Sequence, residues 1–310
     1  MQKILKTLAV LTALGMVIVV IAGAVVTKTG SGDGCGPNWP LCHGQLFPSE
    51  PTLETIIEYT HRLVTGIVGL LVIIFSVWVC VKYRRIKEVV FVALSSIFFL
   101  ILQSILGALA VVYGQSEAVM ALHFGFSLLS YASVFVLAVQ IFQLDKAESL
   151  PQSQIGRSMK AGSLFLWIYV YIVVYLGALV RHTDSEMGCA GWPLCNGEWI
   201  PSHFTTTTII HYTHRLAALF YLIGFIVFFY HVVKHYRRDR ILLVSSGLLF
   251  MFAFFQVISG GLVVLSGLHV YPSLLHALII SLFFGILSYV VLYVYRGISQ
   301  AETQRKGIHL

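Results

Sequence analysis

The sequence reads EYTHR at residues 58–62 and HYTHR at residues 211–215. Each of these boxes follows a short cysteine loop, CGPNWPLCHG starting at Cys35 and CAGWPLCNG starting at Cys189. A loop and box of this specificity, present twice in the same order, indicate that the chain contains two copies of one unit.

An offset of 153 residues relates the two copies over most of a half. It superposes the boxes, and it also superposes residues far from them: Trp39 and Trp192, Gln103 and Gln256, Gly107 and Gly260, and His123 and His276. The duplicated unit therefore extends through about half of the chain.

The composition is that of an integral membrane protein. Of the 310 residues, 58% are hydrophobic and only 11% are charged, whereas a soluble domain carries about 25% charged residues. Eight apolar runs approach the ~20 residues needed to cross a bilayer, and their continuous rather than alternating hydrophobicity favours helices over barrel strands. The runs lie near residues 4–26, 61–81, 89–112, 118–142, 163–181, 209–233, 241–264 and 271–295.

These observations predict an all-α integral membrane protein of eight transmembrane helices, arranged as two four-helix bundles. Each unit crosses the membrane an even number of times, so the repeat is parallel, with a pseudo-two-fold axis along the membrane normal. We expect an N-terminal repeat at residues 1–145, a cytoplasmic linker at 146–160 and a C-terminal repeat at 161–310.

The basic residues predict the orientation. All but four of the 20 lysines and arginines fall on the side of the membrane that holds both termini, which marks that side as cytoplasmic. Both cysteine loops then face outward. The net charge of +7 thus reflects the orientation of the protein in the membrane and does not indicate nucleic-acid binding.

The first apolar run resembles a signal peptide, but its end, GAVVTKTGSGDGCG, has a counterpart in mid-chain, GALVRHTDSEMGCA. A segment duplicated as a mature helix is expected to be retained. No Arg- and Ser-rich transit segment precedes it, which favours a bacterial plasma membrane.

Four histidines are the candidate ligands. His61 and His214 are expected in the first turn of their helices, and His123 and His276 about two turns into theirs, all in the outer half of the bilayer. Ionisable residues at this depth are costly and usually functional. Two histidines per bundle, without a cysteine or carboxylate set, fit bis-histidine haem better than zinc. Gly107, Gly125 and Gly260 would let a flat macrocycle approach the backbone, although ordinary helix packing explains them equally well.

Glu58 is where the two copies differ. It precedes His61 by three residues and shares its helical face, while the second copy has His211 at the same position. The alternatives are a solvated residue at a helix start and a carboxylate that handles protons beside a cofactor. One acidic change after a symmetric duplication predicts that one half performs chemistry and the other carries electrons; the role of His211 stays open.

The pairs Cys35–Cys42 and Cys189–Cys195 are exterior, where disulfides persist. We expect structural disulfides, with a redox role as the alternative. Arg62 and Arg215 follow the ligand histidines, and they are expected either to reach lipid headgroups or to bind haem propionates.

With these residues assembled, the chain resembles the haem A synthase family of the bacterial, cysteine-containing type over essentially its whole length. The resemblance implies oxidation of the C8 methyl group of haem O to a formyl group, through two hydroxylations and a dehydration, which yields haem A for terminal oxidases. It implies that His61 and His123 are axial to haem O, the substrate, that His214 and His276 are axial to haem B, the cofactor, and that Glu58 is catalytic.

Two other readings share some of these features. A dihaem b-type electron carrier would use the same four histidines without needing Glu58, and a transporter would show broken helices or polar midplane residues. The pathway implies a handoff from the farnesyl-transferring haem O synthase. The sequence names no electron donor, oxygen source or oligomeric state.

Overall fold

The computed structural model describes residues 2–114, 116–144 and 155–305. Over this part of the chain the secondary structure is helical, apart from two isolated bridges, Cys42 with Gln45 and Cys195 with Glu198. A short 3-10 helix, η1, spans Ser31–Asp33. The long helices are α1 (Gln2–Lys28), α2 (Leu53–Lys82), α3 (Lys87–Val112), α4 (Glu117–Gln143), α5 (Arg157–His182), α6 (Thr206–His235), α7 (Arg240–Leu265) and α8 (Val270–Arg305).

All eight long helices in the described ranges are long and apolar enough to cross a membrane. Helices satisfy their backbone hydrogen bonds internally, which hydrocarbon demands of any spanning segment. The prediction of an all-α membrane protein with eight spans is confirmed, and the protein is a multi-pass membrane protein.

Two helices begin earlier than their apolar runs. α2 starts at Leu53 and α6 at Thr206, after Thr52 and Thr205, whose hydroxyl oxygens each accept the backbone N–H three residues on, at 3.2 Å. The polar first turns are helical because a capped helix needs no apolar side chains there. The expectation that His61 and His214 lie in a first turn is therefore wrong: both lie more than two turns into their helices.

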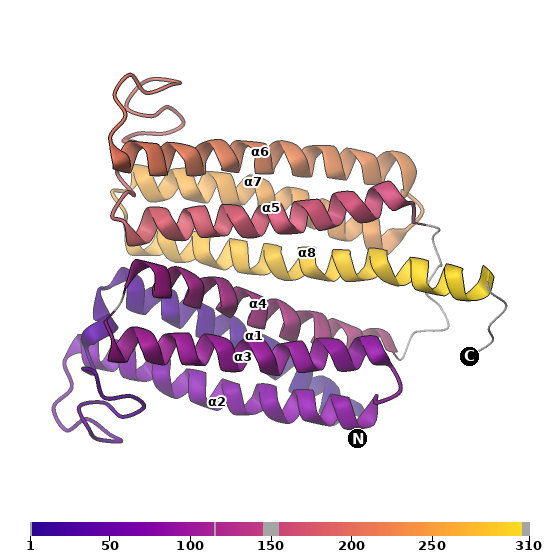
Figure 1. Ribbon diagram of the computed structural model, residues 1–310, viewed down its shortest axis with the longest axis horizontal. Helices are drawn as coiled ribbons and strands as arrows, with labels where there is room; N and C mark the ends of the chain where they lie inside the picture. The colour runs from indigo at the N-terminus through magenta and orange to yellow at the C-terminus, as the bar shows by residue number, and fades with distance from the viewer. Residues whose placement is uncertain (1, 115, 145–154, 306–310) are drawn as a thin grey trace.

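The helices form two groups, α1–α4 and α5–α8, which lie side by side (Figure 1). α4 and α8 are the most buried of the long helices, because they pack on each other between the groups, flanked by contacts of α1 with α8 and of α4 with α5. The expected bounds of the repeats, 1–145 and 161–310, and a pseudo-two-fold relation between them stay predictions. Residues 146–154 of the expected linker lie outside the described residues, and α5 begins at Arg157, inside the range 146–160 that was expected to be linker.

The start of α1 and the end of α8 lie at one end of the molecule, and both cysteine loops lie at the other (Figure 1). At the end away from the loops, Arg296 of α8 pairs with Glu88 of α3, and Gln140 of α4 donates to the same carboxylate at 3.0 Å. This network ties the two groups together at the end away from the cysteine loops.

Candidate active site

The four candidate histidines share one contact: each imidazole lies against a glycine of the preceding helix. A Cβ built on that glycine would come within 3.0–3.2 Å of the ring, so the ring would have to shift by a few tenths of an ångström. The pairs are His61 with Gly23, His123 with Gly107, His214 with Gly177, and His276 with Gly260.

These glycines therefore make room for histidines. Gly107 and Gly260 accommodate imidazoles, and Gly125 lies against the Tyr175 hydroxyl group of the other bundle. Sequence reasoning missed Gly23 and Gly177. The repeat marks them, because the offset is 154 residues ahead of the cysteine loops and 153 after them.

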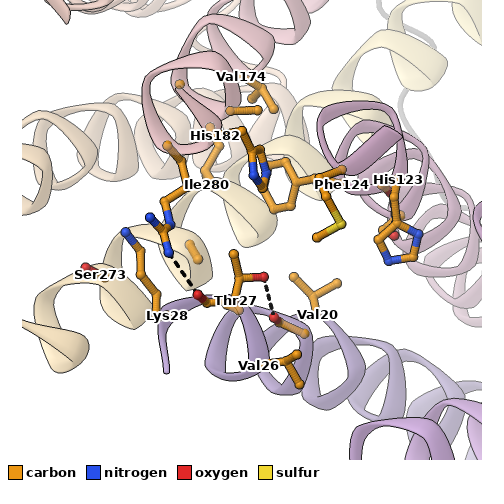
Figure 2. A pocket seen from close by; sticks show the side chains of 18 of the residues that line it. Val20, Val26, Thr27, Lys28, His123, Phe124, Val174, His182, Ser273 and Ile280 are labelled. Atoms are coloured by element: carbon orange, nitrogen blue, oxygen red, sulfur yellow. Dashed lines mark hydrogen bonds between the residues drawn. The ribbon is translucent and has the colours of Figure 1, made fainter. Parts of the chain in front are cut away.

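All four histidines line a single cavity of about 1370 Å³, larger than the ~300–1,000 Å³ of most small-molecule pockets. Side chains from α1, α4, α5 and α8 converge on it (Figure 2). Its walls are mostly apolar, and the cavity reaches into both bundles. It offers room for large, flat, apolar ligands between pairs of imidazoles.

The imidazole nitrogens suit ligation of iron. Nδ1 of His61 and Nδ1 of His214 are buried without a hydrogen-bond partner, a costly state unless a ligand orders the ring. His123 has Nδ1 bonded to the Gln103 carbonyl oxygen at 2.8 Å, the arrangement that typically orients a metal-bound histidine and leaves Nε2 for the metal.

His276 differs from His123. Its Nδ1 is 2.9 Å from the Ser259 hydroxyl oxygen and its Nε2 is 3.1 Å from Nε2 of Gln256. A ligand role for His276 requires the Gln256 amide to release Nε2. The described residues contain no group of three or more His, Cys, Asp or Glu side chains suited to a metal ion, so any iron here would take its protein ligands from histidine pairs.

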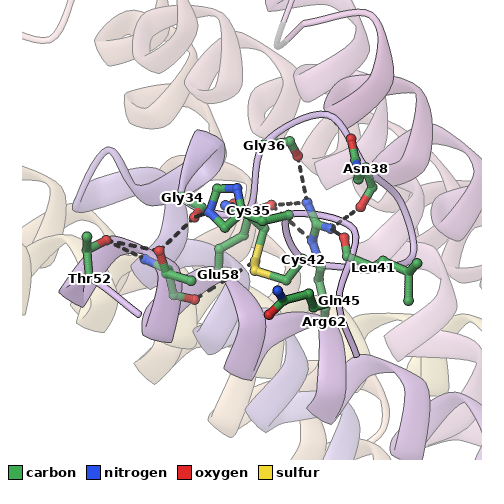
Figure 3. Close-up of a disulfide and its surroundings, with 12 residues drawn as sticks. Gly34, Cys35, Gly36, Asn38, Leu41, Cys42, Gln45, Thr52, Glu58 and Arg62 are labelled. Atoms are coloured by element: carbon green, nitrogen blue, oxygen red, sulfur yellow. Dashed lines mark hydrogen bonds and ion pairs between the residues drawn. A yellow bond between two sulfur atoms is a disulfide. The ribbon is translucent and has the colours of Figure 1, made fainter. Parts of the chain in front are cut away.

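Glu58 is buried beside this cavity and joins α2 to the first cysteine loop (Figure 3). Its Oε2 accepts the Cys35 backbone N–H at 2.7 Å. Its Oε1 accepts Nε of Arg62 at 3.0 Å, and Nη2 of Arg62 pairs with the same oxygen. A carboxylate offers about four acceptor positions, so Oε2 keeps one for a further proton or ligand.

Arg62 and Arg215 hold the cysteine loops. Arg62 donates to the carbonyl oxygens of Leu41 at 2.7 Å and Asn38 at 3.1 Å, and Arg215 donates to those of Leu194 at 3.0 Å and Cys189 at 2.7 Å. The guanidinium groups are thus directed at loop carbonyls, and contact with lipid headgroups or haem propionates stays a prediction.

His211 takes the structural place of Glu58 in the second bundle. Its Nδ1 lies 3.3 Å from the Cys189 backbone nitrogen and its Nε2 lies 3.2 Å from Nε of Arg215, and a neutral imidazole accepts a hydrogen bond at one of these two nitrogens. Both halves therefore place one buried side chain between the loop and the arginine. Only the first half places a carboxylate there.

Disulfides close both loops, Cys35 to Cys42 and Cys189 to Cys195. All four cysteines are buried, and the tryptophans they bracket, Trp39 and Trp192, line the cavity. The loops form part of the wall of the site.

A charged cluster missed by sequence reasoning lies between the bundles. Lys28 at the end of α1 pairs with Glu186, which also pairs with Nη1 of Arg181 at 3.2 Å. Nη2 of Arg181 donates to the Thr27 carbonyl oxygen at 2.8 Å. Lys28, Arg181 and Glu186 line the cavity and join its two halves.

Comparison with known proteins decides the family. A family model, COX15-CtaA, described as cytochrome oxidase assembly protein, matches residues 6–55 and 49–288. The chain belongs to the COX15-CtaA family.

Relatives agree over nearly the whole length. The chain is 44% identical over 301 residues to a heme A synthase of Shouchella clausii, covering 96% of this chain and 99% of the relative. It is 44% identical over 297 residues to one of Geobacillus kaustophilus, covering 96% and 93%. It is 43% identical over 304 residues to one of Bacillus licheniformis, covering 97% and 100%.

The contact of each histidine with a glycine predicts a measurable role in this member of the family. We expect Gly177→Val to lower the haem content of the purified protein about 10- to 100-fold at the C-terminal site, because its side chain would displace the His214 ring. Gly162→Val is the control: Gly162 lies on the same helix as Gly177, and a Cβ there meets no atom within 4 Å. Absorbance spectra per mole of protein report the haem. Equal haem in both variants would contradict this role for Gly177.

Proposed function

We propose that the protein is a haem A synthase that oxidises the C8 methyl group of haem O to a formyl group. The observation that carries the proposal is the asymmetry of an otherwise duplicated site. Two histidine pairs border one cavity, and only one of them has a buried carboxylate, Glu58, where the other bundle has His211.

In this proposal haem O, the substrate, lies in the N-terminal bundle between His61 and His123. Haem B, the cofactor, lies in the C-terminal bundle between His214 and His276. When bound, haem supplies the redox chemistry that no side chain in the cavity can provide. Each of two successive hydroxylations would replace a C–H hydrogen of the methyl group with a hydroxyl group and remove two electrons, which dioxygen or another external oxidant takes up, and the geminal diol would then lose water to leave the formyl group.

The side chains position the substrate and handle charge. Arg62 and the Cys35 N–H hold the Glu58 carboxylate at a fixed place beside the cavity. The remaining acceptor position on Oε2 can take a proton, or stabilise positive charge developing at the methyl carbon. The apolar walls exclude water, which strengthens both effects.

The second bundle has the features of an electron-carrying partner. It repeats the histidine pair and the loop anchor but offers a neutral acceptor, His211, in place of the carboxylate. We infer that haem B in this bundle would carry electrons to or from the N-terminal site, and that Glu58 restricts the oxidation chemistry to the N-terminal half.

We further propose the bacterial plasma membrane as the location, with both termini cytoplasmic and the cysteine loops outside. The placement of the basic residues supports this. Haem O synthase, the farnesyltransferase that makes the substrate, is the proposed donor of haem O.

Haem extraction tests the function. The full-length protein is purified from cells that make haem O, and the extracted haems are identified by mass. Haem B together with haem O, its hydroxylated forms or haem A would support the proposal. Haem B alone, with haem O abundant in the same cells, would contradict it.

A further inference from the structure

The cavity extends farther into the N-terminal bundle than into the C-terminal one. On α2 the residues that line it continue to Ile73, whereas on α6 the last of them is Leu222. Leu222 corresponds to Gly69 under the offset of 153 residues. The cavity therefore follows α2 for four residues more, about 6 Å along a helix.

Two glycines open the wall of α2 at this depth. Gly66 and Gly69 line the cavity, and their counterparts on α6, Leu219 and Leu222, also line it. A Cβ on Gly66 would meet no atom within 4 Å, so protein packing does not require glycine there. Glycine within a helix lowers helix stability. The presence of Gly66 therefore needs a reason other than protein packing.

The core side chains beside the cavity are also smaller in the N-terminal bundle than in the C-terminal bundle. In the C-terminal bundle the rings of Tyr221, Phe225 and Phe283 pack with centroids 4.8–5.2 Å apart. Their counterparts in the N-terminal bundle are all smaller: Val68, Val72 and Ser130. Aromatic rings fill this level of the C-terminal bundle, and smaller buried side chains take their places in the N-terminal bundle.

The N-terminal part of the cavity also reaches the lipid-facing surface. Ile67 and Leu70 of α2 line it although they are 54% and 63% exposed, and Ile101 and Ile105 of α3 line it at 51% and 52%. The counterparts of these four residues do not line the cavity: Phe220, Ile223, Phe254 and Ile258. The cavity thus opens sideways between α2 and α3 at a level where the corresponding residues of α6 and α7 do not line it.

We propose that the slot between α2 and α3, formed by Gly66, Gly69, Ile101 and Ile105, binds the isoprenoid chain of the substrate haem, and that Leu219 and Leu222 exclude such a chain from the other half. The inference rests on the proposed function. Haem O carries a hydroxyethylfarnesyl group where haem B carries a vinyl group, so the two haems differ by one long apolar chain. A slot that leads from the porphyrin cavity to lipid accepts that chain without exposing it to water.

Thr65 adds a polar group at the same wall. It lines the cavity, its Oγ1 has no hydrogen-bond partner, and its counterpart is Ala218. The hydroxyl group at the base of the isoprenoid chain has the chemistry to pair with it. One half therefore carries both the space and a polar group that the substrate needs, and the other half carries neither.

The test replaces the two glycines of α2 with the leucines found at the corresponding positions of α6, in the full-length protein. Gly66→Leu combined with Gly69→Leu should reduce bound haem O and its oxidised products at least 10-fold, in cells that make haem O, while haem B in the C-terminal bundle stays at the wild-type level. Added haem B should still bind the N-terminal site of the purified variant within about 3-fold of the wild-type affinity, read from the Soret band. Gly162→Leu, which adds a leucine away from the cavity, should change neither haem.

The outcomes separate this inference from the proposed function. Haem O retained by the double variant as by the wild type would overturn the slot. Loss of haem O together with loss of added haem B at the N-terminal site would also overturn it, because the leucines would then be blocking the porphyrin itself. If the wild type held no haem O or product, the proposed function would fail whatever the variant did. The reverse change, Leu219→Gly with Leu222→Gly, should let haem O enter the C-terminal site.

Discussion

We expect Glu58→Gln to keep both haems and to slow haem A formation by about 10²- to 10⁴-fold, the usual contribution of a positioned acid–base group. Glutamine preserves the shape of the side chain and an acceptor for the Cys35 N–H, but it removes the negative charge. Arg62 retains its bonds to the loop carbonyls of Leu41 and Asn38, so the loop should stay in place. The measurement is haem A per mole of protein, with haem binding followed by absorbance.

Two further variants sharpen this experiment. Glu58→His copies the second half, where His211 anchors the loop as a neutral acceptor, so it should also bind haem and form no haem A. Glu54→Gln removes an exposed carboxylate one turn earlier on α2 and should leave the rate unchanged. Normal haem A production by Glu58→Gln would exclude a catalytic role for this carboxylate.

The second large effect concerns the resident haem. We expect His214→Ala or His276→Ala to remove haem B from the purified protein. A bis-histidine site that loses one histidine loses a bond to iron and also leaves an empty space beside the haem. His61→Ala and His123→Ala should instead spare haem B and abolish retention of haem O. Extracted haem, quantified against protein, distinguishes the two patterns.

His235→Ala is the matched control, since this exposed histidine sits at the far end of α6 from His214. It should retain haem B in full. Full haem B in His276→Ala would show that His276 is not a ligand, in which case its bonds to Gln256 and Ser259 would be its structural role.

Much of this molecule follows from the sequence alone. Eight apolar runs predict eight helices because a bilayer imposes both length and hydrophobicity on each segment. The duplication is read from one offset, and the recurrence of His61 at His214 and of His123 at His276 nominates the ligands. These are properties of individual segments, so no knowledge of packing is needed to recognise them.

The boundaries of α2 and α6 could not be obtained in this way. Hydropathy detects the part of a helix that lies in lipid, and the polar first turns after Thr52 and Thr205 lie beyond it. As a result the sequence places His61 and His214 too near the helix start.

The contacts that make the site required the tertiary structure. The rotation of α1 and α5 about their axes places Gly23 and Gly177 against imidazoles, and no pattern within one helix reports that rotation. The folding of the cysteine loops brings carbonyl oxygens to Arg62 and the Cys35 N–H to Glu58.

The fold class, the duplication and the asymmetry between Glu58 and His211 can be read from the order of residues. The existence of one cavity that joins both halves, with Gly66 in its wall on one side and Leu219 on the other, emerges from the packed helices. A cavity is the space left by many helices together. Its shape depends on how each helix is turned and spaced against its neighbours, which no single segment encodes.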